Sequence, residues 1–440
     1  MTKVMKYDAY TDSGIDWLGE YPTHWSIWKL KDLTFYQEGP GIMADDFVED
    51  GVPLIRISGL KSSVVSLNGC NFLDPEKVKK RWSHFRLKLG ELLVSASATT
   101  GIAARVDKDT VGAIPYTGLI RFKSRSKLYI NFLQYFLTAS IFTIQIDLQK
   151  SGTTIQHYGP THLGRVVALL PPLSEQRVLT DYLDEKTAQI DHKIDLLNQK
   201  AEQYSRLKHS LINETVTQGL DKYVPMKDSG VEWIGKVPTH WKVKRVKDLF
   251  LESKKKSTTG KETLLSVSEY TGVTRRKDNI EDEGYLTNAS TLVGYKLCSV
   301  GELVINIMLA WKSGLGVSSF DGLVSPSYAV YSPQKSICSS FFHYLFRSDK
   351  AISEFKRKST GIIDSRLRLY SDRFYSIEVA MPDFNEQKAI ADYLDTKTAH
   401  IDSIIEKINI QIDKLKELRK TLIDDVVTGK IKVYQEGESV

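Results

Sequence analysis

The sequence predicts an α+β protein in which two mixed α/β domains alternate with two long coiled-coil helices in a pseudo-twofold internal repeat. Three observations predict this fold class: a tryptophan-rich motif that occurs twice, a Glu-Gln motif that opens a heptad-patterned segment twice, and two intervening stretches of ordinary domain size. The chain's 440 residues also exceed what one compact core usually holds, which favours several domains.

The first duplicated motif, here called the Trp motif, begins each half of the chain. Residues 12–25 read DSGIDWLGEYPTHW, and residues 228–241 read DSGVEWIGKVPTHW. Both tryptophans of the motif belong to the repeated part of the sequence. We therefore interpret them as packing anchors of a turn and not as platforms for stacking bases.

The second duplicated motif, here called the Glu-Gln motif, begins a long helix in each copy. A Glu-Gln pair is followed by Asp-Tyr-Leu-Asp and Lys-Thr-Ala at residues 175–188 and 386–399. Ser174 and Asn385 precede the two pairs and are candidate N-caps. No proline or glycine interrupts either segment before its last turn, which predicts spacer helices over 173–218 and 384–430.

Along both segments, apolar residues recur at alternating steps of three and four, the period of a coiled coil. The predicted seam consists of Leu183, Ile190, Ile194 and Leu197 in the first helix and Leu394, Ile401, Ile405 and Ile408 in the second. Lys208 and Arg419 interrupt it at matching places. This period favours pairing of the two helices with each other; the alternative is two amphipathic helices that each lie on their own domain.

The segments between the motifs are expected to form the α/β domains. Strand-like runs lie at 52–57, 92–95, 113–122 and 166–170 in the first copy and at 263–267, 303–307, 323–331 and 376–380 in the second. One internal helix is expected in each copy, around 130–146 and 339–356. The predicted divisions are 1–172, 173–218, 219–383 and 384–430, followed by a tail at 431–440.

Composition narrows the class of protein. Hydrophobic residues make up 41% of the chain and charged residues 26%, as in ordinary globular proteins. A net charge of +6 permits a nucleic-acid partner without demanding one. Three cysteines without a CxxC pair predict free thiols in a reducing compartment, and no apolar run could span a bilayer. We expect a soluble cytoplasmic protein with no membrane partner.

No complete catalytic motif is present, so we predict no catalytic residue and no metal site in this chain. The phosphate-binding loop, the dinucleotide fingerprint, HExxH and the Pro-Pro-aromatic motif of amino-methylating enzymes are all missing. Asp383, Glu386 and Lys388 mimic the PD…ExK motif of metal-dependent nucleases. Only two residues separate the carboxylates, however, and the first copy has a proline in place of the aspartate, so a helix start with an acidic first turn is favoured.

Basic residues interleaved with aromatic ones occur in both inserts and are candidate DNA contacts, although each run could also be a solvated face. The candidates are Lys79, Lys80, Arg81, Arg86, Arg121, Lys123 and Arg125 in the first insert and Arg275, Arg276, Lys277, Lys356, Arg357, Lys358, Arg366 and Arg368 in the second. A helix over 174–217 would run about 66 Å at about 1.5 Å per residue. Two turns of B-DNA measure roughly 68 Å.

The two motifs, twice and in this order, resemble those of the specificity (S) subunits of type I restriction–modification enzymes. The resemblance implies two target-recognition domains separated by an antiparallel helix pair, each domain reading one half of a bipartite asymmetric site on double-stranded DNA. It also implies two modification (M) subunits, which methylate adenine N6 with S-adenosylmethionine, and restriction (R) subunits, which use ATP and Mg²⁺. By this resemblance the chain itself binds no cofactor and has no catalytic activity.

Two other classes of function stay open at this point. A self-sufficient DNA nuclease or methyltransferase is opposed by the missing active-site motifs. The other class is a coiled-coil scaffold that spaces two protein-binding domains without DNA specificity. Salt-dependent DNA binding separates the last class from a DNA reader, because phosphate contacts weaken steeply with salt.

Overall fold

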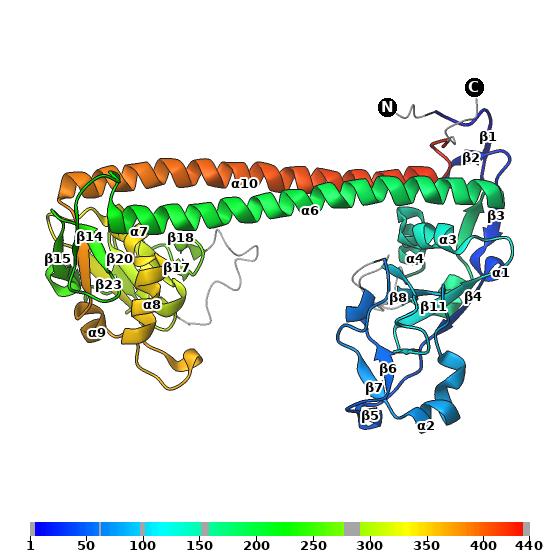
Figure 1. Ribbon diagram of the computed structural model, residues 1–440, viewed down its shortest axis with the longest axis horizontal. Helices are drawn as coiled ribbons and strands as arrows, with labels where there is room; N and C mark the ends of the chain where they lie inside the picture. The colour runs from blue at the N-terminus through cyan, green and yellow to red at the C-terminus, as the bar shows by residue number, and fades with distance from the viewer. Residues whose placement is uncertain (1–4, 61–62, 97–101, 151–157, 277–290, 434–440) are drawn as a thin grey trace. The chain divides into compact units, whose positions relative to one another are not determined.

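The computed structural model describes residues 5–60, 63–96, 102–150, 158–276 and 291–433. The chain divides into two compact units, the first formed by Met1–Leu197 with Ile410–Val440 and the second by Asn198–Asn409. Figure 1 traces both units and the two long helices, α6 (Leu173–Gln218) and α10 (Phe384–Val427). Each unit contains a stretch of both helices.

The described residues of unit 1 form two four-stranded sheets and two two-stranded ones. The central sheet has the order β4 (Thr34–Glu38), β11 (Leu119–Ser124), β8 (Leu92–Ser95) and β9 (Ala103–Arg105). The second has the order β10 (Ile114–Pro115), β6 (Val52–Ile55), β7 (Asn71–Leu73) and β5 (Phe47–Val48). The smaller sheets pair β1 (Tyr10–Asp12) with β2 (Glu20–Pro22) and β3 (Ser26–Lys29) with β12 (Val167–Leu170).

Unit 2 repeats the central sheet and the two smaller sheets, but two further two-stranded sheets stand in place of the second four-stranded one. Its central sheet has the order β16 (Phe250–Glu252), β23 (Tyr328–Pro333), β20 (Leu303–Asn306) and β21 (Leu315–Val317). Two-stranded sheets pair β13 (Met226–Asp228) with β14 (Lys236–Pro238), β15 (Lys242–Arg245) with β24 (Glu378–Met381), β17 (Leu265–Ser268) with β18 (Gly272–Arg275), and β19 (Lys296–Cys298) with β22 (Gly322–Val324). The predicted α+β internal repeat is therefore confirmed, and it extends to inserts that share little sequence.

The helices of each domain pack on the central sheet and fill its core with aromatic side chains. They are α3 (Ile130–Thr138), α4 (Ser140–Lys150) and α5 (Pro160–Leu163) in unit 1 and α7 (Ser339–Phe346), α8 (Asp349–Lys358) and α9 (Ser371–Tyr375) in unit 2. Phe122 and Phe136 are fully buried in the first core, and Phe250 and Phe342 stack edge to face in the second.

The prediction of one internal helix per insert was wrong, because two short helices stand in its place. In unit 1 the break falls at Ala139, and the backbone N–H of Ser140 donates to Asp424 of α10 at 2.6 Å. In unit 2 the break falls before Ser348, whose hydroxyl accepts from the N–H of Ala351 and caps α8. In a continuous helix, the backbone N–H groups of Ser140 and Ala351 would donate to carbonyl groups of the preceding turn and not to the side chains of Asp424 and Ser348.

The long helices start slightly before the predicted caps. Because α6 begins at Leu173 and α10 at Phe384, Ser174 and Asn385 lie inside the first turn and are not N-caps. In the second copy the cap is Asp383, whose carboxylate accepts from the N–H of Glu386 at 3.0 Å. This bond explains the nuclease-like spacing of the two acidic residues as a helix start.

In each unit the two long helices lie antiparallel and packed together (Figure 1). In unit 1 Arg419 near the end of α10 pairs with Asp191 of α6 at 2.9 Å, and in unit 2 Lys208 of α6 pairs with Asp402 of α10 at 2.6 Å. These are the cations that interrupt the seam, and their partners occupy matching repeat positions. Among the seam residues, Leu183, Leu394, Ile401 and Ile408 are buried and Ile190, Ile194, Leu197 and Ile405 are half-buried.

Candidate functional site

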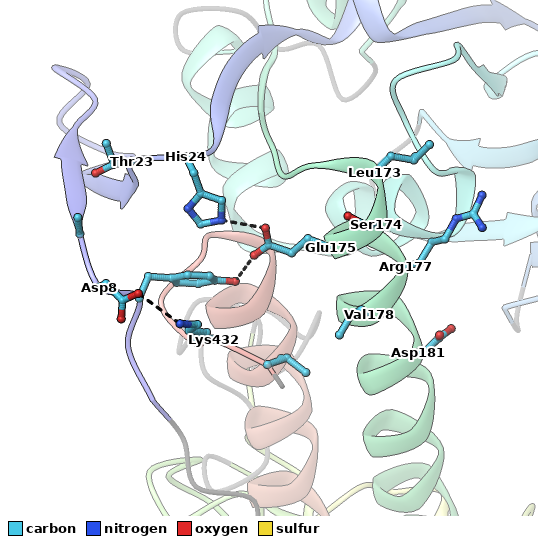
Figure 2. A pocket seen from close by; sticks show the side chains of 13 residues that line it. Asp8, Thr23, His24, Leu173, Ser174, Glu175, Arg177, Val178, Asp181 and Lys432 are labelled. Carbon is cyan, nitrogen blue, oxygen red and sulfur yellow. Dashed lines mark hydrogen bonds and ion pairs between the residues drawn. The ribbon is translucent and has the colours of Figure 1, made fainter. Parts of the chain in front are cut away.

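In unit 1 the two duplicated motifs meet at the start of α6, around the carboxylate of Glu175. The indole N–H of Trp25 donates to it at 3.1 Å and the hydroxyl of Tyr7 at 2.6 Å, while Nε2 of His24 lies 2.9 Å away. Figure 2 shows Glu175 between the strands of the Trp motif and the helix. Residues far apart in the sequence thus fix one end of the spacer helix to its domain.

Unit 2 has the same joint between the Trp motif and the start of its long helix, here around Glu386. A tyrosine contact like that of Tyr7 is missing among the described residues of this unit. The indole N–H of Trp241 donates to this carboxylate at 3.1 Å, and Nε2 of His240 lies 2.7 Å from it. Tyr223, at the position corresponding to Tyr7, is 96% exposed. The duplicated glutamate, tryptophan and histidine therefore form a structural joint in both units, as expected of packing anchors.

The glutamine of the Glu-Gln motif completes the joint from inside the core. Gln176 is fully buried, accepts from the N–H of Tyr129 at 2.7 Å and donates to the carbonyl of Lys127 at 3.0 Å. Gln387 is equally buried and accepts from the N–H of Cys338 at 3.0 Å. Each glutamine thus satisfies backbone groups just before α3 or α7, where an unpaired buried polar group would be costly.

Two tyrosines attach the next turn of each long helix to its domain. Tyr135 of α3 donates to Asp184 at 2.6 Å, and Tyr344 of α7 donates to Asp395 at 2.7 Å. Burial, followed by the hydrogen bond to the carboxylate, raises the pKa of both tyrosines. The hydroxyls therefore remain donors, and the early aspartates of the helices serve as docking groups.

A cavity of about 1140 Å³ lies beside the joint of unit 1. Its lining includes His24, Arg177 and Asp181, and an ion pair of 3.5 Å between Asp8 and Lys432 closes one side (Figure 2). Charges of both signs line it, so it does not favour a polyanion.

The basic run of the first domain lies on the surface. Lys79, Lys80 and Arg81 occupy a helical turn at Val78–Trp82 that follows α2 (Pro75–Lys77), and all three are exposed. Lys123 and Arg125 are exposed at the end of β11. Within the described ranges, none of these five side chains has an ion pair or hydrogen bond, so they can reach phosphates without giving up a contact.

Two other candidates of the first domain are used inside the fold. Arg121 is 9% exposed, and its guanidinium donates to the carbonyls of Arg86 and His84 at 3.0 and 2.9 Å. Arg86 itself donates to the carbonyl of Gly112 at 2.9 Å. Arg121 thus ties a loop to the central sheet and Arg86 joins two loops, so both guanidinium groups are already used inside the fold.

In the second domain, several of the candidate basic residues already have partners within the domain. Arg357 pairs bidentately with Glu354 at 2.6 and 2.7 Å, Lys356 pairs with Asp364 at 3.0 Å, and Arg368 donates to the carbonyl of Leu367. Lys358 is half-buried, Arg276 is half-buried, and Arg275 and Arg366 are exposed. Lys277 lies outside the described residues.

Arg56 is a candidate base-reading residue that the sequence analysis missed. Its guanidinium stacks 4.3 Å from the ring centre of Tyr116 and donates to Asn71 at 2.9 Å. These residues and Thr117 line an open hollow of about 500 Å³. Such a fork is oriented in advance for bidentate recognition. Arg56 stands alone in sequence, and only the parallel pairing of β6 with β10 brings Tyr116 beside it.

The second domain has a similar stack, in which the guanidinium of Arg275 lies 4.6 Å from the ring centre of Phe320. Arg275 was predicted from a basic run, whereas its aromatic partner was not. The pair lines a hollow of about 530 Å³. In both domains an arginine stacked on an aromatic ring thus lies beside an open hollow.

Two similar α/β units on paired helices, joined by duplicated motifs, define the architecture of a specificity subunit. The family model of the type I restriction modification DNA specificity domain matches residues 22–203 and 238–414, and the chain belongs to this family. The subunit family is non-catalytic. The resemblance stated from the motifs is therefore confirmed.

Similar proteins span nearly the whole chain. The MjaVIII specificity subunit of Methanocaldococcus jannaschii is 22% identical, covering 94% of both chains, and the StySPI specificity subunit of Salmonella potsdam is 17% identical, covering 96% of this chain and 92% of the relative. Among solved structures, the HsdS subunit from Thermoanaerobacter tengcongensis has a TM-score of 0.52 at 16% identity, covering 93% and 98%. A chain from a study of type I R-M complex assembly and conformational transition has a TM-score of 0.67 at 15% identity, covering 92% and 98%.

In unit 2, two titratable side chains inside the fold, Cys298 and His343, have pKa values that burial shifts. Burial raises the pKa of the Cys298 thiol to about 12, and burial followed by the charge of Arg347 lowers the pKa of His343 to about 4. The neutral ring of His343 accepts from the N–H of Val317 at 3.2 Å.

Within the described residues no group of three His, Cys, Asp or Glu could hold a metal, and no described helix is long and apolar enough to cross a membrane.

Proposed function

We propose that this chain is the DNA-reading subunit of a type I restriction–modification complex, in which each α/β domain reads one half of a bipartite asymmetric site. The observation that supports this most directly is the repeated central sheet, which carries different loops and different basic residues in the two units. A common scaffold with two unlike surfaces suits two unlike half-sites.

In this proposal the chemistry belongs to partner subunits. Two M subunits bind the chain and methylate adenine N6 with S-adenosylmethionine, and R subunits use ATP and Mg²⁺ to restrict unmethylated DNA. The family assignment supports this division, as does the fold shared with a chain from a type I R-M assembly. Methylation requires the adenine to leave the base stack, and the pocket that receives it would be the M subunit's.

The test is a single-molecule methylome of the source strain with and without this gene. We expect deletion to remove one split adenine-methylation motif, which would also reveal the target sequence. Co-expression with the neighbouring methyltransferase in a host that lacks the motif should restore it. If neither experiment changes any motif, the DNA-reader proposal fails and the scaffold hypothesis is favoured.

Neutralising the exposed basic run of the first domain should weaken DNA binding at every sequence. Each phosphate contact contributes about 0.9 to the slope of log K against log salt. The Lys79→Ala/Lys80→Ala/Arg81→Ala variant should therefore lose a slope of about 2 to 3 in a fluorescence-anisotropy titration of the complex.

The matched control is Lys193→Ala/Lys200→Ala/Lys414→Ala, which removes the same charge from exposed positions on the long helices. It should keep the wild-type slope. Equal losses in both variants would mean that net charge alone drives binding. An unchanged slope in the first variant would remove this run from the DNA surface.

A further inference from the structure

A short loop of unit 2 between α8 and α9 holds a firm hairpin-like shape. Thr360 and Arg368 exchange two backbone hydrogen bonds of 2.9 Å. On either side of Arg368, Leu367 and Leu369 are 8% and 1% exposed, and the N–H of Leu369 donates to the carbonyl of Ile307 at 2.9 Å. The base of the loop is thus anchored in the core next to β20.

The tip of this loop is apolar and turned to solvent. Ile362 is 100% exposed and Ile363 is 54% exposed. Gly361 precedes them with φ +149°, and a Cβ there would lie 2.6 Å from the carbonyl oxygen of Arg366. Glycine is therefore required for the tight turn that directs two adjacent isoleucines outward. An apolar tip on an anchored loop is a typical sign of a binding surface.

The charges around the tip favour a polyanionic partner. Asp364 is neutralised by Lys356 at 3.0 Å. Arg366 is exposed and has no ion pair with any described residue, whereas Lys358 is half-buried and lines a hollow that also contains glutamate side chains. Cations beside a projecting apolar side chain are the composition of DNA wedges, in which isoleucine, leucine or phenylalanine enters a base step while basic residues hold the phosphates.

We propose that Ile362 and Ile363 form an apolar wedge that inserts into a base step of the half-site contacted by unit 2, with Arg366 on a flanking phosphate. This inference rests on the proposed DNA-reading function and adds a mechanism to it. The DNA target would then be recognised in two ways: through its base edges, and through the ease with which this base step unstacks. Flexible pyrimidine–purine steps in that half-site would be favoured.

The experiment uses the complex with its methyltransferase and a duplex that carries the methylation motif, with 2-aminopurine at successive positions. Wild-type complex should raise the fluorescence at one step of one half-site. Ile362→Ser/Ile363→Ser should abolish this rise and weaken binding about tenfold, which corresponds to about 1.4 kcal/mol. Because Ile362 contacts no core, the variant should fold normally.

Leu251→Ser is the matched control, since Leu251 is 63% exposed on β16; it should behave as wild type. If wild-type complex fails to bind the motif duplex, the DNA-reading function itself is wrong. If wild type binds but the double variant binds equally well with the same fluorescence, the wedge is refuted while the function stands. If the double variant no longer co-purifies with the methyltransferase, the tip is a protein-docking element and the wedge is likewise refuted.

Discussion

Replacing Trp241 with alanine is expected to destabilise unit 2 by about 3 to 5 kcal/mol, the range for removing a fully buried tryptophan. Its side chain is 0% exposed, lies edge-on to Phe341 at 6.3 Å between ring centres, and donates to Glu386. The substitution would leave a cavity and also remove a donor from the carboxylate that holds α10. Hydrogen exchange read by mass spectrometry should show faster exchange in peptides of unit 2.

The contrast is Trp233→Ala in the same motif. Trp233 is only partly buried against the core, and its indole N–H has no partner among the described residues. Its loss should cost clearly less than that of Trp241. Peptides of the unit 1 core should keep wild-type exchange in both variants. Equal effects of the two substitutions would contradict the role of the Glu386 joint.

Under the proposed reading of a bipartite site, inserting one heptad into each long helix is expected to widen the gap between the methylated half-sites by about three base pairs. Seven residues add about 10.5 Å at about 1.5 Å per residue, against about 3.4 Å per base pair. The natural insertion points follow Leu197 in α6 and Asn409 in α10, where the two units divide. Contacts within each unit are then preserved, and the seven-residue seam continues in register.

Four-residue insertions at the same points give the informative comparison. They add about 6 Å, enough for about two base pairs, but shift the apolar seam as a stutter does. The heptad variant should thus methylate a motif with a longer gap efficiently, and the four-residue variant less so. A methylome with an unchanged gap in the heptad variant would contradict the role of the helices as a ruler.

The repeated frame was predictable because its constraints are local in sequence. A heptad period, the absence of helix breakers and the duplicated motifs gave both long helices, and α6 has the predicted bounds. The shared sheet of the inserts was not predictable, because cross-strand pairing constrains where side chains point and tolerates many sequences. The predicted run at 113–122 divided into β10 and β11, which belong to different sheets.

The candidate DNA surface was only partly predictable for the same reason. Runs of cations are visible in sequence, but burial separates Arg121 from Lys79, and a pairing between distant strands places Arg56 on Tyr116. Ile362 and Ile363 look like core residues in sequence. Only the anchored loop and its glycine show that they face solvent, and a hydrophobicity pattern carries no information on this point.

Unit 1 is assembled from two separate segments of the chain, one before and one after unit 2, and this arrangement sets an order of events during synthesis. Tyr10 donates to the carbonyl of Gly429 at 3.0 Å, and Met5 bridges to Lys432. Unit 2 is complete once residue 409 has left the ribosome, whereas unit 1 gains its closing contacts only after the segment that begins at Ile410 has been made. Domains fold as units while the chain emerges. We therefore expect unit 2 to mature first, and a product that stops before Ile410 to carry an unclosed unit 1 that is open to proteolysis.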